Sequence, residues 1–495
     1  MEADTPHRAG LPMRPGALLA WLASGLAALG ASEPTKPNIL FLITDQHMAD
    51  ALSCAGNAHV KTPNLDKLAA RGVRFTRNYV ANPLCVPSRA SLFSSRMPHE
   101  LGIYGNTLGT DLAEKSVPTL GELMRQGGYD TFYAGKWHVH EAFPAYAASA
   151  RRRTIPGFEL LPMEGGKDPR AGDKKTEQKS PQCDPHVAAA AVKFLETKHA
   201  RPFLLTVSLL NPHDICEFPY FEGFKAMLPA DDGALPPLRP NAQDATTVPS
   251  VLRSEKENRG AWAYGRWTEQ QWRQYQWVYY RLVESSDRLL GQVLDALERS
   301  EFKDNTLVVF TSDHGEMLGA HRLVSKEKLY EEAAKVPLIV ALPGRPAGVN
   351  TRSLTCGMDL MPTFLDFADV PRPAELRGRS LRPLLEGKPD REPEFVAAES
   401  FDPEARMIRT SRYKYVKYTF GENSEQFFDL EQDPYERRNL IAQAELAPEI
   451  QRHRALLNKW MADTKDEFRK GTEILAGLKA REGADEDGKA KAKKK

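Results

Sequence analysis

The run Pro37-Asn38-Ile39-Leu40-Phe41-Leu42-Ile43, which continues into Thr44-Asp45-Gln46, decides the fold class of this chain. Its apolar residues are contiguous, which is typical of a parallel strand that is buried on both faces. The same character recurs in three further runs, at residues 130–134, 202–209 and 305–311. The segments between the runs carry helical patterns, the clearest at residues 64–71, 119–126 and 277–300. This alternation predicts an α/β layered fold around a large, mostly parallel sheet.

Polar residues that can act in catalysis or ligand binding follow each of the four predicted strands directly. The four clusters are Asp45-Gln46, Gly135-Lys136-Trp137-His138, Asn211-Pro212-His213-Asp214 and Asp313-His314-Gly315-Glu316. Open α/β sheets bind their ligands outside the carboxyl ends of the strands. We therefore expect these clusters to meet at one edge of the sheet and to form a functional site.

A fifth element is the run Cys85-Val86-Pro87-Ser88-Arg89, followed by a helical pattern over residues 90–93. Pro87 suits the first position of a helix. Cys85 would then project from a helix N-terminus beside Arg89, where backbone N–H groups and the helix dipole favour negative charge. This pattern predicts an anion site with a reactive side chain next to it.

Two motifs resemble those of one known family, the sulfatases. Residues 85–89 resemble the sulfatase signature Cys-x-Pro-Ser-Arg, although Phe93 and Ser95 depart from the leucine and glycine that are usual a few residues later. Residues 128–138 resemble the second signature, Gly-Tyr-x-Thr followed by Gly-Lys-x-His. The resemblance extends from about Pro37 to Leu440. It implies an alkaline-phosphatase-like three-layer sandwich with a smaller C-terminal α+β domain that contains an antiparallel sheet.

The resemblance also implies a modified nucleophile. Cys85 would be oxidised to formylglycine (3-oxoalanine) by a formylglycine-generating or anaerobic sulfatase-maturating enzyme. The hydrated aldehyde would attack sulfur, with Arg89 lowering the pKa of one hydroxyl and Asp313 helping to remove its proton. His213 would protonate the leaving alcohol, and His138 would take the proton of the second hydroxyl, so that sulfate is expelled.

A divalent metal is expected at Asp45, Gln46, Asp313 and His314, together with the modified Cys85. Oxygen-dominated ligation suits a hard cation. We predict Ca²⁺, with Mn²⁺ or Mg²⁺ as alternatives. Gln46 and His314 depart from the acidic and amide residues of most sulfatases, and similar departures occur in phosphonate monoester hydrolases of the same superfamily.

The substrate anion would be held by lysines, as the resemblance implies. Lys136 and Lys326 would bind the sulfate, with Lys328 as the alternative to Lys326. His213 would face the oxygen of the leaving group, and Asn106 resembles a substrate-binding asparagine of some relatives. Because Lys136 and His138 are two residues apart on a predicted extended segment, we expect both to face one cavity.

The composition describes an ordinary globular protein: 495 residues, 41% hydrophobic, 27% charged and net charge +1. This balance gives no indication of a nucleic-acid partner. Residues 16–31 form an apolar run after Arg8 and Arg14 and end in small residues, which predicts a signal peptide over residues 1–31 and a secreted or periplasmic protein rather than a stable membrane span. We divide the rest into a catalytic domain (32–388), a C-terminal α+β domain (389–475) and a charged tail (476–495).

The five cysteines leave four after Cys85, which permit three pairings or free thiols. Residues 151–180 carry eight Lys or Arg against five Asp or Glu, a composition that could hold a polyanion. We therefore predict an exported sulfatase that acts on a sulfated saccharide, with a small ester such as choline sulfate as a second substrate class. The alternatives are a phosphonate, phosphate mono- or diester hydrolase, and a non-catalytic protein that binds sulfated glycans.

Overall fold

An eight-stranded sheet forms the centre of the part that the computed structural model describes, which comprises residues 36–106, 112, 115–139, 155–162, 183–218, 222–243, 248–252 and 267–468. In spatial order the strands are β5 (Glu159–Leu160), β4 (Asp130–Gly135), β6 (Phe203–Pro212), β1 (Asn38–Asp45), β7 (Thr306–Ser312), β8 (Leu338–Ala341), β2 (Val73–Phe75) and β9 (Gly348–Asn350). β8 runs antiparallel to β7 and β2, and the other neighbouring pairs are parallel. The predicted mostly parallel sheet is confirmed.

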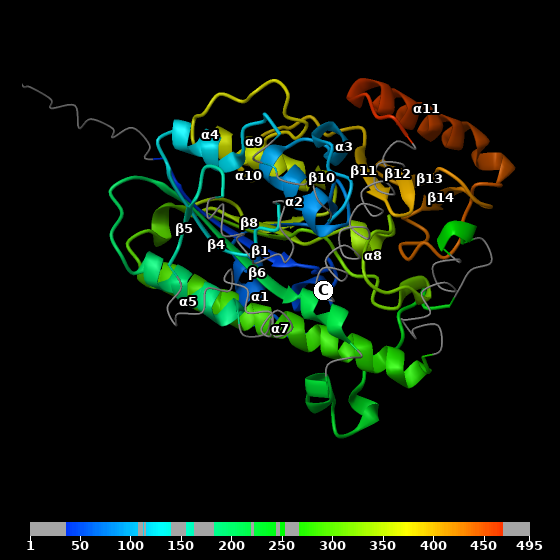
Figure 1. The fold of residues 1–495 in the computed structure, drawn as a ribbon, viewed down its shortest axis with the longest axis horizontal. Coiled ribbons are helices and arrows are strands. Elements are labelled where there is room, and N and C mark those ends of the chain that lie inside the picture. Colours follow the sequence, from blue (N-terminus) through cyan, green and yellow to red (C-terminus); the bar gives the residue numbers. More distant parts are fainter. Residues whose placement is uncertain are drawn as a thin grey trace, which may run out of the picture. The chain divides into compact units, whose positions relative to one another are not determined.

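Helices cover both faces of this sheet, as Figure 1 shows. Successive residues of β1 alternate between the two layers: Phe41 packs in one apolar core and Leu40 in the other, both without exposed surface. The first core contains α2 (Cys85–Ser94), α4 (Leu120–Gln126) and α9 (Leu360–Phe367). The second contains α1 (Pro63–Ala70), α5 (Asp184–Leu195) and α7 (Glu269–Arg299). Each fully buried side chain of this size contributes about 1.5–3 kcal/mol. The three-layer sandwich is confirmed.

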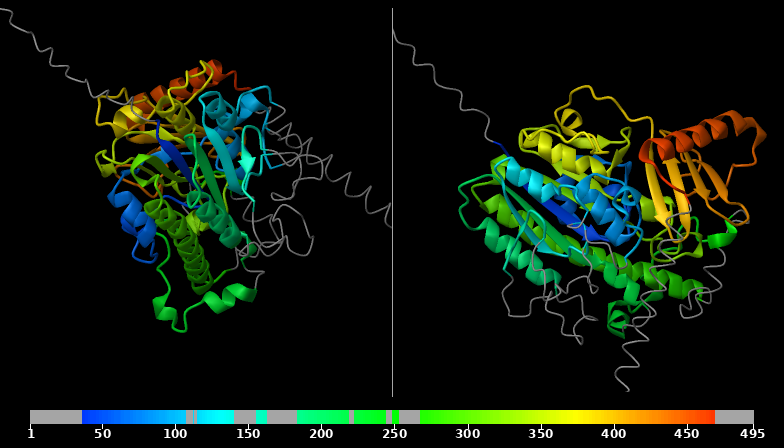
Figure 2. Two further views of the ribbon diagram at one scale, coloured as in Figure 1. Left: turned by 90° about the vertical axis from the view of Figure 1, so that its left-hand side faces the viewer. Right: turned by 45° about the horizontal axis from the view of Figure 1, so that its top comes forward.

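A separate four-stranded antiparallel sheet follows in the C-terminal region. It contains β11 (Val396–Phe401), β12 (Glu404–Arg409), β13 (Tyr413–Tyr418) and β14 (Glu425–Asp429) in sequential order. Figure 2 shows α11 (Ala447–Thr464) across these strands, and Ile450, Leu457 and Trp460 of this helix share an apolar core with Tyr415 and Phe427. The predicted α+β region is confirmed, and the predicted boundary at residue 388 lies between α10 (Arg382–Leu385) and β11.

The remaining described elements are short. They are β3 (Asn78–Tyr79) paired with β10 (Thr355–Cys356), the helices α3 (Pro98–Leu101) and α8 (Glu331–Ala334), and 3-10 turns at Ser53–Ala55, His213–Glu217, Glu222–Met227, Asp232–Ala234, Lys303–Asn305, Ala320–Arg322, Gly357–Asp359 and Ala444–Leu446.

Three predicted boundaries were wrong in position. α2 begins at Cys85, two residues before Pro87. α7 begins at Glu269 rather than at Trp277, because Thr268 and Gln271 form a reciprocal capping box there. β6 continues to Pro212, so that part of the third polar cluster belongs to the strand itself.

Several predictions fall on residues outside the described part: the signal peptide, the tail at 476–495 and most of the basic insertion. All five cysteines are described, and each is a free thiol. Among the described helices, none combines the length and the apolar character that crossing a bilayer requires.

Candidate active site

The polar clusters meet as predicted at the carboxyl edge of the large sheet. Asp45 ends β1, Lys136 follows β4, and Asp313 follows β7. α2 brings Cys85 and Arg89 to the same place. All five residues are buried, with at most 1% of their surface exposed.

Arg89 holds this edge together. Its Nε donates to Asp313 Oδ2 at 2.7 Å, and a terminal nitrogen donates to Asp45 Oδ2 at 3.2 Å. The other terminal nitrogen donates to the Lys136 carbonyl at 2.7 Å and to Ser208 Oγ at 2.9 Å. The guanidinium thus links α2 to β6 and to the ends of β1, β4 and β7, and its planar set of donors matches two carboxylates at once.

Asp45 is only partly satisfied by these cations. Its Oδ2 also accepts from Lys136 Nζ at 2.6 Å, whereas its buried Oδ1 has no hydrogen-bond partner in the described part of the chain. Burial opposes ionisation, yet Lys136, His213 and His314 hold the pKa of Asp45 well below its usual value. Oδ1 is therefore a buried anionic oxygen with an unused lone pair, which is a suitable ligand for a cation.

The atoms around Oδ1 fit a divalent metal. Ligand atoms of Asp45, Cys85, Asp313 and His314 all lie within 4.8 Å of one another. His314 Nδ1 faces the Gly315 carbonyl at 2.9 Å, to which it must donate, so in the neutral ring Nε2 is the free acceptor. That Nε2 lies 3.2 Å from Cys85 Sγ and 3.8 Å from Asp45 Oδ1. Two carboxylates and one imidazole suit a hard or borderline ion, without selecting among Ca²⁺, Mn²⁺ and Mg²⁺.

Gln46 directly follows Asp45, the last residue of β1. Its backbone adopts a positive φ of 68° and donates to Asp313 Oδ1 at 3.1 Å. Its side-chain Oε1 accepts from Lys326 Nζ at 2.6 Å. Lys328 instead donates to the Lys326 carbonyl at 3.0 Å. The structure therefore brings Lys326 to another predicted site residue.

Positive charge surrounds the predicted nucleophile. Burial raises the pKa of the Cys85 thiol, but Lys136, Lys326 and His314 outweigh it and lower the pKa well below its usual value. Burial, with Lys136 nearby, lowers the pKa of His138 to about 4. His138 is therefore a neutral imidazole at pH 7.

The prediction that Lys136 and His138 lie on an extended segment was wrong, although both side chains approach the same cluster. β4 ends at Gly135, and His138 has a positive φ of 63°, so the segment is not extended. Lys136 reaches Asp45, while the His138 ring lies close enough to Cys85 for that residue to act on its pKa. The positive φ angles of Gly135 and His138, rather than strand alternation, bring both side chains to the cluster.

His213 lies on the solvent side of the cluster. Its side chain is 27% exposed, against 0% for Asp45, and its Nε2 is 3.9 Å from Asp45 Oδ1. Burial, with Lys326 and Lys136 nearby, lowers the pKa of His213 to about 4. Asp184 accepts from the backbone N–H groups of Leu210 and Asn211, at 2.7 and 2.8 Å, and so fixes the segment that carries His213.

Asn106 and Ser95 stabilise the two ends of α2. Asn106 Oδ1 accepts from the Val86 N–H at 3.0 Å, next to Cys85, which satisfies one of the free donors of the helix N-terminus. Ser95 has a left-handed backbone (φ 52°), which explains why glycine is usual there. The Ser95 hydroxyl donates to the Met358 carbonyl and accepts from Gly378 N–H, at 2.8 and 3.0 Å.

Sequence reasoning missed three buried residues that support the site: Ser208, Asp184 and Glu316. Ser208 binds Arg89, and Asp184 orders the end of β6. Glu316 accepts from Gln46 Nε2 at 2.5 Å. Only Glu316 had a sequence signal, since it belongs to the cluster Asp313-His314-Gly315-Glu316.

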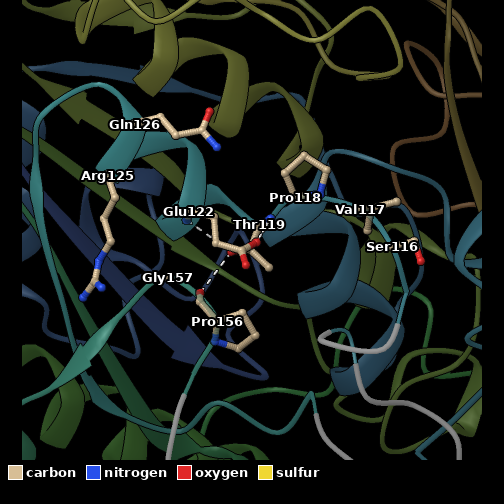
Figure 3. Close-up of a pocket in the computed structure, with 9 residues that line it drawn as sticks. All are labelled: Ser116, Val117, Pro118, Thr119, Glu122, Arg125, Gln126, Pro156 and Gly157. Atoms are coloured by element: carbon tan, nitrogen blue, oxygen red, sulfur yellow. Dashed lines mark hydrogen bonds between the residues drawn. The ribbon is translucent and has the colours of Figure 1, made fainter.

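Two other features are not part of this site. The pocket in Figure 3 lies at the N-terminus of α4, between Thr119 and Pro156, and is lined by none of the predicted site residues. A second potential ligand group joins His99, Glu399 and Asp466. There the Arg406 guanidinium binds Asp466 at 2.5 and 2.8 Å, so that a protein cation already neutralises this carboxylate.

Comparison with known proteins identifies the family. The sulfatase family model matches residues 37–370. The chain belongs to the sulfatase family. This confirms the predicted membership and makes the protein a sulfuric ester hydrolase by family. Residues 319–463 also match the C-terminal model of N-sulphoglucosamine sulphohydrolase.

Individual sulfatases and a related hydrolase resemble the chain over most of its length. A Δ4,5-hexuronate-2-O-sulfatase of Bacteroides thetaiotaomicron is 31% identical over 90% of this chain and 93% of its own. A solved 2-O GAG sulfatase aligns with a TM-score of 0.75 at 29% identity, over 88% of this chain and 94% of its own. The phosphonate monoester hydrolase of Agrobacterium radiobacter aligns with a TM-score of 0.72 at 25% identity, over 86% and 96%.

Proposed function

We propose that this sulfatase hydrolyses sulfate esters of a saccharide through a formylglycine formed from Cys85 and a divalent metal held by Asp45, Gln46, Asp313 and His314. The observation that carries the proposal is the position of Cys85. Its Sγ lies at the N-terminus of α2, 3.2 Å from His314, beside a carboxylate oxygen of Asp45 that no donor among the described residues satisfies.

Charge neutralisation is the main task of such a site, because the nucleophile must approach an anionic ester. When bound, the metal would supply positive charge next to residue 85, and the oxidised cysteine would supply a hydrated aldehyde as nucleophile. Lys136 and Lys326 would bind the sulfate oxygens from two sides. Arg89 would keep Asp45 and Asp313 ionised and in position.

The histidines would move the protons. Neutral His138, which contacts Cys85, is ready to accept a proton from the nucleophilic residue. His213 would protonate the leaving oxygen, but with a pKa of about 4 it is uncharged in the free enzyme. A bound sulfate ester would offset the charge of Lys136 and Lys326 and so raise the pKa of His213 toward the working pH.

A saccharide substrate is supported by the named relatives, which act on hexuronate and GAG sulfates. His213 is the exposed member of the cluster, so the alcohol part of the substrate would extend toward it. Asn106 is proposed to bind this part of the substrate in addition to capping α2. Export through the N-terminal signal and modification by a maturating enzyme belong to the same proposal.

Phosphonate or phosphate ester hydrolysis is the second candidate. It is favoured by Gln46 and His314, which replace residues usual in sulfatases, and by the likeness to a phosphonate monoester hydrolase. Initial rates on an aryl sulfate, an aryl phosphate diester and an aryl phosphonate, measured side by side, would separate the two. We expect the sulfate ester to have the highest kcat/KM.

Mass spectrometry of the tryptic peptide that spans residues 78–89 tests the nucleophile. We expect Cys85 to have lost sulfur and gained a carbonyl that reacts with hydrazides. In an activity assay of the same protein, we expect the sulfate ester of 2-O-sulfated unsaturated uronides to be cleaved. Protein from the native host with an unmodified thiol and full activity would overturn the proposal. Tight binding of sulfated glycans without turnover would instead support the non-catalytic alternative.

A further inference from the structure

Glu316 contacts Gln46 of the proposed metal site without being a proposed metal ligand itself. It has no exposed surface, and its two oxygens have different partners. Oε2 accepts from Gln46 Nε2 at 2.5 Å. Oε1 accepts from Tyr275 Oη at 2.8 Å, from Leu318 N–H at 3.1 Å and from Ser325 N–H at 2.6 Å.

These contacts fix the orientation of the Gln46 amide. An ionised carboxylate only accepts hydrogen bonds, so the Gln46 atom that faces Glu316 must be the NH₂ group. The amide oxygen is then forced to the opposite side, where it accepts from Lys326 Nζ at 2.6 Å. Cys216 lies 3.3 Å from Nε2 and 3.4 Å from Oε1, so its thiol contacts both atoms and does not select either orientation.

The same carboxylate holds the loop that delivers Lys326. Ser325, whose N–H binds Glu316, directly precedes this lysine. The Met317 N–H donates to the Ser325 carbonyl at 2.8 Å, which closes the loop on the segment that carries Glu316. One buried side chain therefore orders both partners of the Gln46–Lys326 contact.

We propose that Glu316 is a positioning residue that makes Gln46 present its oxygen, and not its nitrogen, to the metal and to Lys326. The inference rests on the proposed metal site, which it deepens. An amide oxygen can bind a hard cation, whereas an amide NH₂ group cannot. Residues behind metal ligands commonly alter metal affinity by 10–100-fold when they are replaced.

Glu316→Gln is the sharpest variant, because it changes hydrogen-bond polarity and not size. The new glutamine would keep its oxygen toward the three donors at Oε1 and place its NH₂ group against Gln46. Two donors would then meet, and the Gln46 amide would rotate to bring its oxygen toward residue 316. The metal and Lys326 would lose their acceptor.

A double variant that combines Gln46→Glu with Glu316→Gln restores the pattern. The amide introduced at position 316 donates to one oxygen of the carboxylate introduced at position 46. The other oxygen of that carboxylate accepts from Lys326 and is available to the metal. Gln46→Glu alone places two carboxylates against each other and should impair binding. Such reciprocal rescue is strongly non-additive, and a residue with only a packing role would not produce it.

Calorimetric titration of the chelator-treated full-length proteins with Ca²⁺, repeated with Mn²⁺, is the measurement. We expect affinity to fall at least about tenfold in Glu316→Gln and to return to within about threefold of wild type in the double variant. Tyr275→Phe removes one donor to Glu316 but leaves the direction of the Gln46–Glu316 hydrogen bond unchanged. It should change the metal affinity by less than about threefold.

Two results would overturn the inference: wild-type affinity in Glu316→Gln, or no recovery in the double variant. Failure of the double variant to fold would do the same, since the exchange preserves each hydrogen bond. A wild-type protein that binds neither ion would overturn it together with the proposed metal. If the variants show the expected metal affinities but the enzyme prefers phosphonates, the inference stands and only the proposed substrate is overturned.

Discussion

Two of the buried charge networks in the described part of the molecule differ in how closely protein cations approach their carboxylate oxygens. The site network joins the carboxyl edge of the large sheet to α2, and it consists of Asp45, Arg89, Lys136, Asp313 and His314. The linking network joins α8 to the C-terminal sheet, and it consists of Glu331, Lys335, Lys414 and Glu436.

The linking network is balanced in sign. Lys414 Nζ lies 3.2 Å from Glu331 and 2.8 Å from Glu436, and Lys335 lies 3.1 Å from Glu331. Two cations thus face two carboxylates. Tyr79 Oη also donates to Glu331 at 3.0 Å. Such a network fixes the contact between two parts of a fold, and nothing in it demands a ligand.

The site network is left incomplete. Arg89 and Lys136 satisfy Asp45 Oδ2, but Oδ1 has no donor and faces the imidazole of His314 at 3.8 Å. A buried charge therefore indicates function only where the protein leaves one of its atoms unsatisfied beside a reactive group. Substitutions in the two networks should separate activity from stability.

Cys85→Ala should produce the largest effect. Because the proposed nucleophile forms on this residue, we expect kcat/KM for sulfate esters to fall by about 10⁴-fold or more. The free energy of unfolding should change by no more than about 1 kcal/mol, since only the terminal atoms of one small side chain are removed. Steady-state rates and urea unfolding of the same preparations provide both measurements. Cys85→Ser should accumulate a sulfated enzyme at best, and full turnover by the alanine variant would refute the proposed chemistry.

Lys414→Met should lower the stability of the protein and leave its activity unchanged. It leaves Glu331 and Glu436 buried without their shared cation, which costs about 3–5 kcal/mol of unfolding free energy. The rate per folded molecule should stay at the wild-type value. Lys459→Met is a matched control, because Lys459 is exposed and pairs with Asp463 on the surface of α11. It should cost less than about 1 kcal/mol, and an equal loss in both variants would contradict the contrast between the networks.

Metal removal tests the incomplete network directly. A ligand present at a hundred times its Kd stabilises the folded state by about 2.7 kcal/mol. We expect the melting temperature in Ca²⁺ to exceed that in chelator, and Asp45→Asn to abolish most of this difference. Lys414→Met should retain the full difference, because the carboxylates of the linking network already face lysines of the protein. Equal melting temperatures with and without Ca²⁺ in the wild type would remove the support for a metal at Asp45.

The central part of the fold was predictable because its signal is local. β1, β4, β6 and β7 are contiguous apolar runs that bury both faces, and each observed strand begins within one residue of its prediction. The strands β2, β5 and β9, which lie at or next to the edges of the sheet, have only two or three residues and are partly exposed, so no periodicity identifies them. Their pairing depends on long-range contacts that the local sequence does not express.

The site residues were predictable as a group because motifs and strand ends coincide. What remained hidden was the source of their positions. α2 begins at Cys85 with a cap from Asn106, which lies well beyond the helix in the sequence. Glu316 was visible as part of a motif, but its role depends on a loop that returns through Ser325. Contacts of this kind arise only once the chain has folded.

The smallest expected effect is a pH dependence of stability at His99, which ties α3 to the C-terminal sheet. His99 Nδ1 lies 2.6 Å from Glu399 Oε2 and Nε2 lies 3.2 Å from the Thr464 carbonyl, so both ring nitrogens face acceptors. Only the imidazolium can donate to both. Burial opposes this charge, but Glu399 outweighs burial and raises the pKa of His99.

A pKa that is raised in the folded state stabilises the protein at low pH. The contribution of His99, about 1–2 kcal/mol, should be complete below about pH 6.5 and should be lost as the pH rises through the folded pKa. His99→Gln should lack it, so the difference in unfolding free energy between wild type and variant should shrink with increasing pH. Urea unfolding from about pH 5.5 to about pH 8.5, a range that brackets the ordinary histidine pKa, measures this difference. A constant difference would mean that His99 acts through packing alone. The expected slope would show that protonation of His99 stabilises the contact between α3 and the C-terminal sheet.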